Sequence, residues 1–264
     1  MQRLNTTDKP SKSFKDYQGE DQVVTSFELR AKLRDKEETI VNARSLIPSL
    51  DDAVDGFRDG ELIVISGPTK NGKTLLAQTL TVNFSKRQNY ALWFTFEVPA
   101  RQFLWQFPTL PLIYMPQKLK PRAMDWFKDR VMESFEKYNT RIIFIDHLHY
   151  LVDLARQKNV SLEIGTVIRE LKTLAVQNDF VIFLLCHTAK SKIDEGLSYE
   201  SIRDSSFISQ ESDCVIMIKR TPDGGENTAR LRIEFHRRTG VMEKVVGLVK
   251  VGGLLAELKV EAEK

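Results

Sequence analysis

The segment GPTKNGKT, residues 67 to 74, constrains this chain more than any other, and it directly follows an apolar run at 61 to 66. It has the form G-x-x-x-x-G-K-T. In such a loop, glycines let backbone N–H groups curl around a polyphosphate, the lysine reaches the outer phosphates and the threonine hydroxyl ligates Mg²⁺. The helix expected after the loop adds its N-terminal dipole to the same anion. We therefore expect a nucleotide site formed by Gly67, Pro68, Thr69, Lys70, Asn71, Gly72, Lys73 and Thr74.

Length and composition limit the class of protein. The 264 residues suit one large α/β domain with appendages, or two small domains. The net charge of +3 is too balanced to indicate nucleic acid by itself. The apolar runs are shorter than the ~20 residues that cross a bilayer, and the N-terminus lacks a signal-peptide core. Cys186 and Cys214 lie in apolar runs, as buried thiols do in a reducing compartment. We expect a cytoplasmic protein without a membrane partner.

The apolar pattern predicts a polar N-terminal part followed by alternating strands and helices. We expect a flexible arm over 1–24, a linker over 25–45 with a short helix near 26–38, and one domain over 46–264. Its rhythm predicts an α/β fold with a mostly parallel sheet, helices on both faces and a C-terminal antiparallel extension. The expected strands are 61–66, 90–96, 141–147, 180–187, 213–220, 229–237, 244–251 and 254–260, and the expected helices are 75–86, 99–107, 121–138 and 161–178.

Polar residues where strands end mark the candidate chemistry, because ligands of an open parallel sheet lie beyond the carboxyl ends of its strands. Four stand out: Glu97, Asp146, His187 and Arg237. Asp146 is placed to order Mg²⁺, Glu97 to polarise a water aimed at the γ-phosphate, and His187 to sense hydrolysis through a hydrogen bond. Structural roles also remain open: a turn aspartate, a glutamate at a helix N-terminus ahead of Pro99, and a structural histidine.

A zinc site is a rival interpretation of the histidines. His147, His149, Cys186 and His187 would meet if the strands at 141–147 and 180–187 are neighbours. The spacings H-x-H and C-H match no standard zinc pattern, which disfavours such a site.

Two loops on the ligand side of the predicted sheet, 153–160 and 188–205, suit contact with a polymer. Lys190 and Lys192 offer charge to phosphates, and flanking Gly and Ser residues offer mobility. Solvated loops have the same composition, so composition alone leaves nucleic-acid binding open. The aromatic segment 93–107 is instead predicted to be core rather than a platform for stacking bases.

Together these segments resemble the RecA-like ATPase domain of DnaB-type ring helicases, a family that includes the mitochondrial helicase Twinkle and phage primase-helicases. The resemblance covers roughly residues 46 to 251. GPTKNGKT is similar to the family's phosphate loop, FTFEVP to its catalytic-glutamate segment, FIDHLHYL to its Mg²⁺ segment and LLCHTAK to its γ-phosphate sensor. This implies catalytic roles for Lys73, Glu97 and His187, and Mg²⁺ ligation by Thr74 and Asp146. The segment SIRDSSFISQESDCVIMIKR matches a further family pattern at Arg203, Ser205, Ser206, Gln210 and Asp213.

The segment HRRTG resembles the family's arginine-finger turn. It implies that Arg237 reaches the nucleotide of a neighbouring subunit and neutralises charge in the transition state. The family usually has a lysine two residues earlier, where this chain has Phe235. Either Arg238 supplies that charge, or the coupling between subunits is weaker. Only about 45 residues precede the core, so we expect a stand-alone motor whose helix near 26–38 is similar in place to the family's linker helix.

The resemblance implies a homo-hexameric DNA helicase that needs ATP and Mg²⁺. It would hydrolyse ATP at subunit interfaces, pull single-stranded DNA through the ring and unwind the duplex during replication. Lys190, Lys192 and Arg203 are the expected DNA contacts, and a primase or loader in trans is an expected partner. Two alternatives remain open: a RecA- or RadA-like recombination ATPase, and a KaiC-like regulatory ATPase that binds no nucleic acid.

Overall fold

The chain divides into two units, residues 1–40 and 41–264. In the first unit, α1 (Ser26–Arg34) begins with a capping box: Glu28 N donates to Thr25 Oγ1 at 3.2 Å, and Thr25 N donates to Glu28 Oε2 at 2.8 Å. This helix lies within the predicted range. The computed structural model describes residues 19, 21–34, 41–152, 160–187, 205–221 and 227–258.

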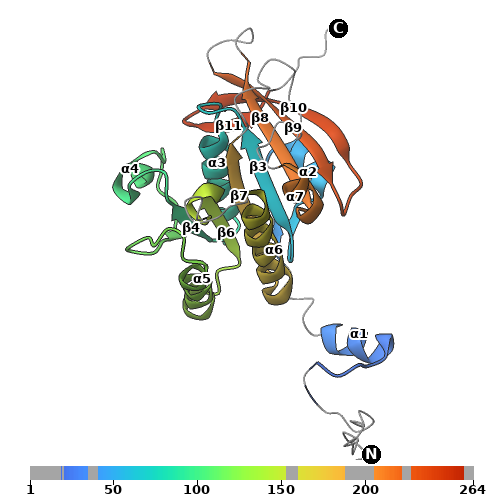
Figure 1. The fold of residues 1–264 in the computed structure, drawn as a ribbon. Coiled ribbons are helices and arrows are strands. Elements are labelled where there is room, and N and C mark those ends of the chain that lie inside the picture. Colours follow the sequence, from blue (N-terminus) through green and yellow to red (C-terminus); the bar gives the residue numbers. More distant parts are fainter. Residues whose placement is uncertain are drawn as a thin grey trace, which may run out of the picture. The chain divides into compact units, whose positions relative to one another are not determined.

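A nine-stranded sheet forms the centre of the second unit (Figure 1). Six neighbouring strands, from β8 to β5, are parallel, and β9, β10 and β11 continue the sheet as antiparallel strands. The predicted α/β class, with its antiparallel extension, is confirmed. In sheet order the strands are β11 (Leu254–Glu257), β10 (Met242–Val251), β9 (Thr228–His236), β8 (Cys214–Arg220), β3 (Leu62–Gly67), β7 (Val181–His187), β6 (Ile142–Asp146), β4 (Ala91–Thr95) and β5 (Ile113–Tyr114).

The central strands are apolar on both faces because helices cover both. In β3, Ile63 and Ile65 pack into one apolar cluster, while Leu62 and Val64 pack into a second cluster on the opposite face. All four side chains are fully buried. Such unbroken apolar runs are typical of parallel strands between two helical layers.

Three helices contribute to each apolar cluster. Helices α2, α3 and α4 bury side chains in the first cluster, and α5, α6 and α7 bury theirs in the second. The crossover from β3 therefore runs over one face, and the chain leaving β7 leads to a helix on the other. The helices are α2 (Pro48–Val54), α3 (Lys73–Ser85), α4 (Ala100–Trp105), α5 (Met124–Tyr138), α6 (Val160–Asn178) and α7 (Ser205–Glu211). None of the helices in the described part of the chain is both long and apolar enough to cross a membrane.

Several short elements were not predicted from the sequence. Helix α2 begins at Pro48, whose fixed φ suits a first helical position, and Asp55, with a φ of 53°, caps its carboxyl end. The two-residue strands β1 (Asn42–Ala43) and β2 (Phe57–Arg58) pair beside it. The sequence pattern predicted neither β5 nor α7.

The antiparallel extension is shaped by tight turns. The turn between β9 and β10 closes with Gly240 N donating to His236 O at 2.9 Å, and Gly240 has a φ of 73°. Gly252 and Gly253, with φ values of 59° and 87°, form the turn before β11, as two-residue hairpins require. Because β9 runs antiparallel, its last residue lies at the amino end of β3.

Candidate nucleotide site

The phosphate loop begins where β3 ends, and its first glycine cannot be replaced by a larger residue without a clash. Gly67 has a φ of 148°, and a Cβ there would lie 2.1 Å from the carbonyl oxygen of Ile218 in β8. Farther along, Asn71 Oδ1 accepts a 2.9 Å hydrogen bond from Arg220 N. Gly72, with a φ of 99°, is the N-cap of α3. The loop is therefore held closely against β8, and its backbone leads into the positive end of a helix dipole.

Lys73 extends back into this loop. Its ammonium group is buried and donates to Gly67 O at 2.8 Å and to Pro68 O at 2.9 Å. Burial lowers the pKa of Lys73, and the charges of Asp146 and Glu97 oppose that shift. An ammonium group that already lies among backbone carbonyls of the loop is positioned to bind an anion there.

Thr74 and Asp146 provide oxygen ligands beside the lysine. Thr74 Oγ1 donates to Asp146 Oδ2 at 2.9 Å, and the register pair of Asp146 with Thr95 places the carboxylate at the carboxyl end of the sheet. Burial raises the pKa of Asp146 to about 6, although the hydrogen bond from Thr74 lowers it. A cation beside this buried carboxylate would favour its ionised form, and a hydroxyl plus a carboxylate is a donor set that Mg²⁺ accepts. The residues present therefore fit the expected metal.

His187 and Glu97 reach the same edge of the sheet. His187 is the register partner of Gly67, so its side chain lies beside the phosphate loop. Glu97 follows β4, is exposed, and places Oε2 at 3.8 Å from His187 Nε2 and at 3.4 Å from His147 Nδ1. The two imidazole rings lie 4.4 Å apart. Burial lowers the pKa of His187, and it lowers that of His147 to about 4, so both rings are neutral near pH 7.

The four-residue zinc site considered from the sequence is only partly assembled. His147 and His187 meet, and the His149 ring lies 5.3 Å from that of His147. The thiol of Cys186 is fully buried, and burial raises its pKa to about 12. Glu97 joins the two histidines instead. The sequence spacing of these residues did not indicate this contact, because Glu97 is brought to His147 by the pairing of β4 with β6.

Arg237 is the one strand-end candidate that the fold does not bring to this edge. Cys214 pairs with Ile63 at the start of β3 and with His236 at the end of β9. Arg237 therefore lies at the amino end of β3, roughly 16 Å along the strand from the phosphate loop. Arg237 lies at the opposite edge because β9 runs antiparallel, which carries its carboxyl end away from the phosphate loop.

The two neighbouring arginines differ in what they contact. Arg238 Nε donates to Glu61 Oε1 at 2.8 Å, and Arg238 Nη2 donates to Val54 O at 2.8 Å and to Gly56 O at 2.6 Å. Arg237 is exposed and donates to the backbone carbonyl of Gln210. Arg238 thus binds the start of β3 to the end of α2 within its own chain.

Asp213, matched to a family pattern, has a structural role. Its Oδ2 accepts hydrogen bonds from Leu62 N at 2.8 Å and from Lys172 Nζ at 2.7 Å, which fixes the start of β3. Three other sequence candidates, Lys190, Lys192 and Arg203, lie outside the described residues, as do 153–159 and 188–204 of the two loops.

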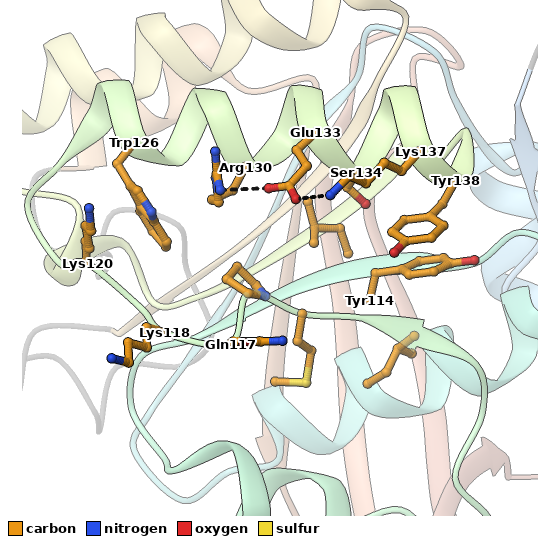
Figure 2. A pocket seen from close by; sticks show the side chains of 14 residues that line it. Tyr114, Gln117, Lys118, Lys120, Trp126, Arg130, Glu133, Ser134, Lys137 and Tyr138 are labelled. Carbon is orange, nitrogen blue, oxygen red and sulfur yellow. Dashed lines mark hydrogen bonds and ion pairs between the residues drawn. The ribbon is translucent and has the colours of Figure 1, made fainter.

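A separate hollow of about 880 Å³ lies between α5 and the segment that follows β5 (Figure 2). Tyr114 stacks on Tyr138 at one end with a ring separation of 4.3 Å, and Trp126 lines the other end. Glu133 pairs with Arg130 at 2.8 Å. None of the phosphate-loop residues, Asp146, Glu97 or His187 lines this hollow, so it is distinct from the candidate nucleotide site.

Residues 112–248, just over half of the chain, match the family model described as "DnaB-like helicase C terminal domain". The chain belongs to this family. The matched segment begins after the phosphate loop and Glu97, and it includes Asp146, His187 and Arg237. The sheet with its phosphate loop is accordingly the RecA-like fold of P-loop ATPases.

Comparisons with individual proteins agree with the family. The chain is 21% identical over 228 residues to a "Probable replicative DNA helicase" of Trieres chinensis, and 23% identical over 237 residues to the "Replicative DNA helicase DnaB" of Mycoplasma pneumoniae. The alignments cover 73% and 74% of this chain. They cover 50% of each relative, so the chain spans about half the length of the curated relatives it matches.

Two solved structures share the fold. One, whose title describes an "ATPase Domain", superposes with a TM-score of 0.78 at 17% identity, covering 90% of this chain and 100% of that one. A second, titled "The Structure Of A DnaB-Like Replicative Helicase And Its Interactions With Primase", gives a TM-score of 0.77 at 17% identity, covering 89% and 69%. At this identity the likeness establishes the fold alone.

Proposed function

We propose that this chain is the motor domain of a replicative DNA helicase, which hydrolyses ATP and moves on single-stranded DNA to unwind the duplex. The observation that carries the proposal is the meeting of Lys73, Thr74, Asp146, Glu97 and His187 at the carboxyl edge of the sheet. Family membership favours a helicase over a RecA-like recombinase or a KaiC-like regulatory ATPase.

Each residue has a role that follows from its position. Lys73 and the loop backbone would bind the phosphates of ATP, and Thr74 with Asp146 would hold Mg²⁺. Glu97 is exposed, and its carboxylate lies near His187 at the carboxyl edge of the sheet. There it would accept the proton of the attacking water. His187, beside Gly67, would contact the γ-phosphate and register its loss.

We further propose that a ring, expected to be hexameric, completes the site. Arg237 lies at the far end of β3 from its own phosphate loop, so it would act on the nucleotide of a neighbouring copy. Arg238 is an unsuitable finger because its guanidinium binds Glu61, Val54 and Gly56 of its own chain.

Loops 153–160 and 188–205, with Lys190, Lys192 and Arg203, are the proposed contacts to the DNA backbone, so binding should weaken steeply as salt rises. A primase or a loader is a proposed partner. Cys186 and Cys214 are buried free thiols, which fits a reducing compartment, and we place the protein in the cytoplasm.

ATPase activity with and without single-stranded DNA, combined with unwinding of a forked duplex, tests the proposal. Lys73→Ala is the inactive control, because it removes the ammonium group from the loop. We expect DNA to stimulate hydrolysis and the fork to be unwound. An ATP hydrolysis rate that DNA does not change, with no ring visible by electron microscopy, would indicate a regulatory ATPase. DNA-stimulated hydrolysis without unwinding of the fork would indicate a recombinase.

A further inference from the structure

Glu97, His147 and His187 form a cluster that the proposed hydrolysis does not fully explain. Each offers one ligand atom, and the three atoms lie within 4.8 Å of one another. His147 in particular has no part in binding ATP or Mg²⁺ in the proposed function. Its Nδ1 is buried and makes no hydrogen bond to any described residue, yet it lies 3.4 Å from Glu97 Oε2.

The spacing of these atoms is close to that of a first coordination shell. Zinc binds imidazole nitrogen and carboxylate oxygen at about 2.0–2.2 Å in a tetrahedron, which places ligand atoms about 3.4 Å apart. The Glu97 Oε2 to His147 Nδ1 distance is 3.4 Å, and that from Glu97 Oε2 to His187 Nε2 is 3.8 Å. Small side-chain rotations would complete the shell and leave one position open, as in sites with two histidines and a glutamate.

The chemistry of the cluster selects a particular class of metal. Imidazole nitrogen suits zinc and its transition-metal neighbours, whereas Mg²⁺ prefers oxygen ligands. The chain has four histidines, and the fourth, His236, is buried beside Glu61 at 3.2 Å. Both cysteines are buried as well. The cluster is therefore the best-formed site for such an ion within the described part of the chain.

We infer that Glu97, His147 and His187 bind a divalent transition-metal ion of the zinc class, and that this ion inhibits ATP hydrolysis. The metal would occupy the Glu97 lone pair that otherwise accepts a proton. It would also occupy Nε2 of His187, the residue that pairs with Gly67 of the phosphate loop. The inhibitory part of this inference rests on the proposed function, whereas metal binding does not.

The binding test uses the full chain without a histidine tag, with Mg²⁺ in large excess to saturate the Thr74–Asp146 site. Titration with Co²⁺ is followed by its visible absorption, and Zn²⁺ is then added to displace it. We expect one equivalent to bind with tetrahedral bands. His147→Phe keeps the ring contacts and should weaken binding at least about tenfold. His149→Phe, the matched control, should bind as the wild-type protein does, and Glu97→Gln is a second variant that should weaken binding.

The inhibition test adds Zn²⁺ to ATPase assays at the same Mg²⁺ excess. We expect His147→Phe to hydrolyse ATP like the wild-type protein without zinc and to resist zinc, while His149→Phe is inhibited. Lack of saturable Co²⁺ binding by the wild-type protein overturns the inference. Unchanged Co²⁺ binding by both His147→Phe and Glu97→Gln also overturns it, as does a loss of Co²⁺ binding in His149→Phe equal to that in His147→Phe. If the wild-type protein hydrolyses ATP normally but binds no metal, this inference alone is rejected. If it binds the metal but hydrolyses no ATP, the proposed function alone is rejected.

Discussion

Thr74 Oγ1 donates a 2.9 Å hydrogen bond to Asp146 Oδ2, and this bond joins the first turn of α3 to the last residue of β6. The two residues are separated by 72 positions in the sequence. Their contact brings a hydroxyl and a buried carboxylate to one point beside the Lys73 ammonium group. A cation that took the place of this hydrogen bond would be ligated by both oxygens without any change in the fold.

Replacing Thr74 tests whether its hydroxyl is a metal ligand. Thr74→Ala should reduce ATP hydrolysis by about 100-fold and raise the Mg²⁺ concentration required, because one oxygen ligand is lost at a site of developing charge. Thr74→Ser keeps the hydroxyl and should retain most activity. Steady-state ATPase across a Mg²⁺ titration measures both, and an unchanged Mg²⁺ requirement in Thr74→Ala would exclude this role.

Asp146→Asn should make the protein more stable and inactive. The pKa of Asp146 is raised to about 6 in the fold, so the fold prefers the protonated carboxyl. The resulting stabilisation is complete below the unfolded pKa near 4 and is lost as the pH rises through about 6. The neutral amide keeps this stabilisation, so near neutral pH the variant's free energy of unfolding should exceed the wild-type value by about 3 kcal/mol.

Urea denaturation from acid to neutral pH, without nucleotide or Mg²⁺, checks this prediction. The difference between Asp146→Asn and the wild-type protein should grow between about pH 4 and pH 6 and be absent below that range. A difference of the same size at every pH would mean that the amide acts through packing rather than through the charge.

Gly67→Ala tests the close approach of the phosphate loop to β8. The added Cβ would meet the Ile218 carbonyl oxygen at 2.1 Å, so the loop must move. We expect a loss of about 3 kcal/mol in the free energy of unfolding together with weaker nucleotide binding. Gly240→Ala is the control, because its φ is also positive, at 73°, but its Cβ meets nothing within 4 Å. It should cost about 1–2 kcal/mol at most, and an equal loss in both variants would show that backbone strain alone is responsible.

The adjacent arginines should separate stability from activity. Arg238→Ala leaves Glu61 buried without its guanidinium partner, so the free energy of unfolding should fall by about 2–3 kcal/mol. Arg237→Ala should leave the Tm nearly unchanged and abolish hydrolysis while ATP still binds. Thermal denaturation, nucleotide binding and ATPase assays on both variants decide the matter. A normal rate of ATP hydrolysis in Arg237→Ala would exclude Arg237 as the arginine finger.

The sequence was sufficient for features that depend on local pattern. The apolar runs of the parallel strands and the G-x-x-x-x-G-K-T loop place Lys73, Thr74 and Asp146 correctly, because strand ends in a parallel sheet share one edge. Long helices such as α5 and α6 were predicted within a few residues. Each carries enough turns for its apolar spacing to be visible.

Features set by strand order or by short segments could not be read in the same way. Helix α2 has only seven residues and no side-chain cap at Ile47, so it gives little periodic signal. The sequence predicts an antiparallel β9, but the position of Arg237 also depends on the pairing of β9 with β8. The contact of Glu97 with His147 likewise depends on the pairing of β4 with β6. Sequence distance carries no information on either.

The Arg238–Glu61 contact ties the amino end of strand β3 to the turn that carries Arg237, so that β3 can transmit a movement between its two ends. Glu61 directly precedes β3 and binds the arginine next to Arg237, while Gly67 ends the same strand at the phosphate loop. β3 is hydrogen-bonded on both sides, to β7 and β8, and strands held in this way resist bending. A shift of the loop along the strand axis would therefore be transmitted as a rigid displacement to the turn that presents Arg237. In the proposed ring, such a displacement would couple the phosphate site of one copy to the Arg237 turn that the neighbouring copy contacts.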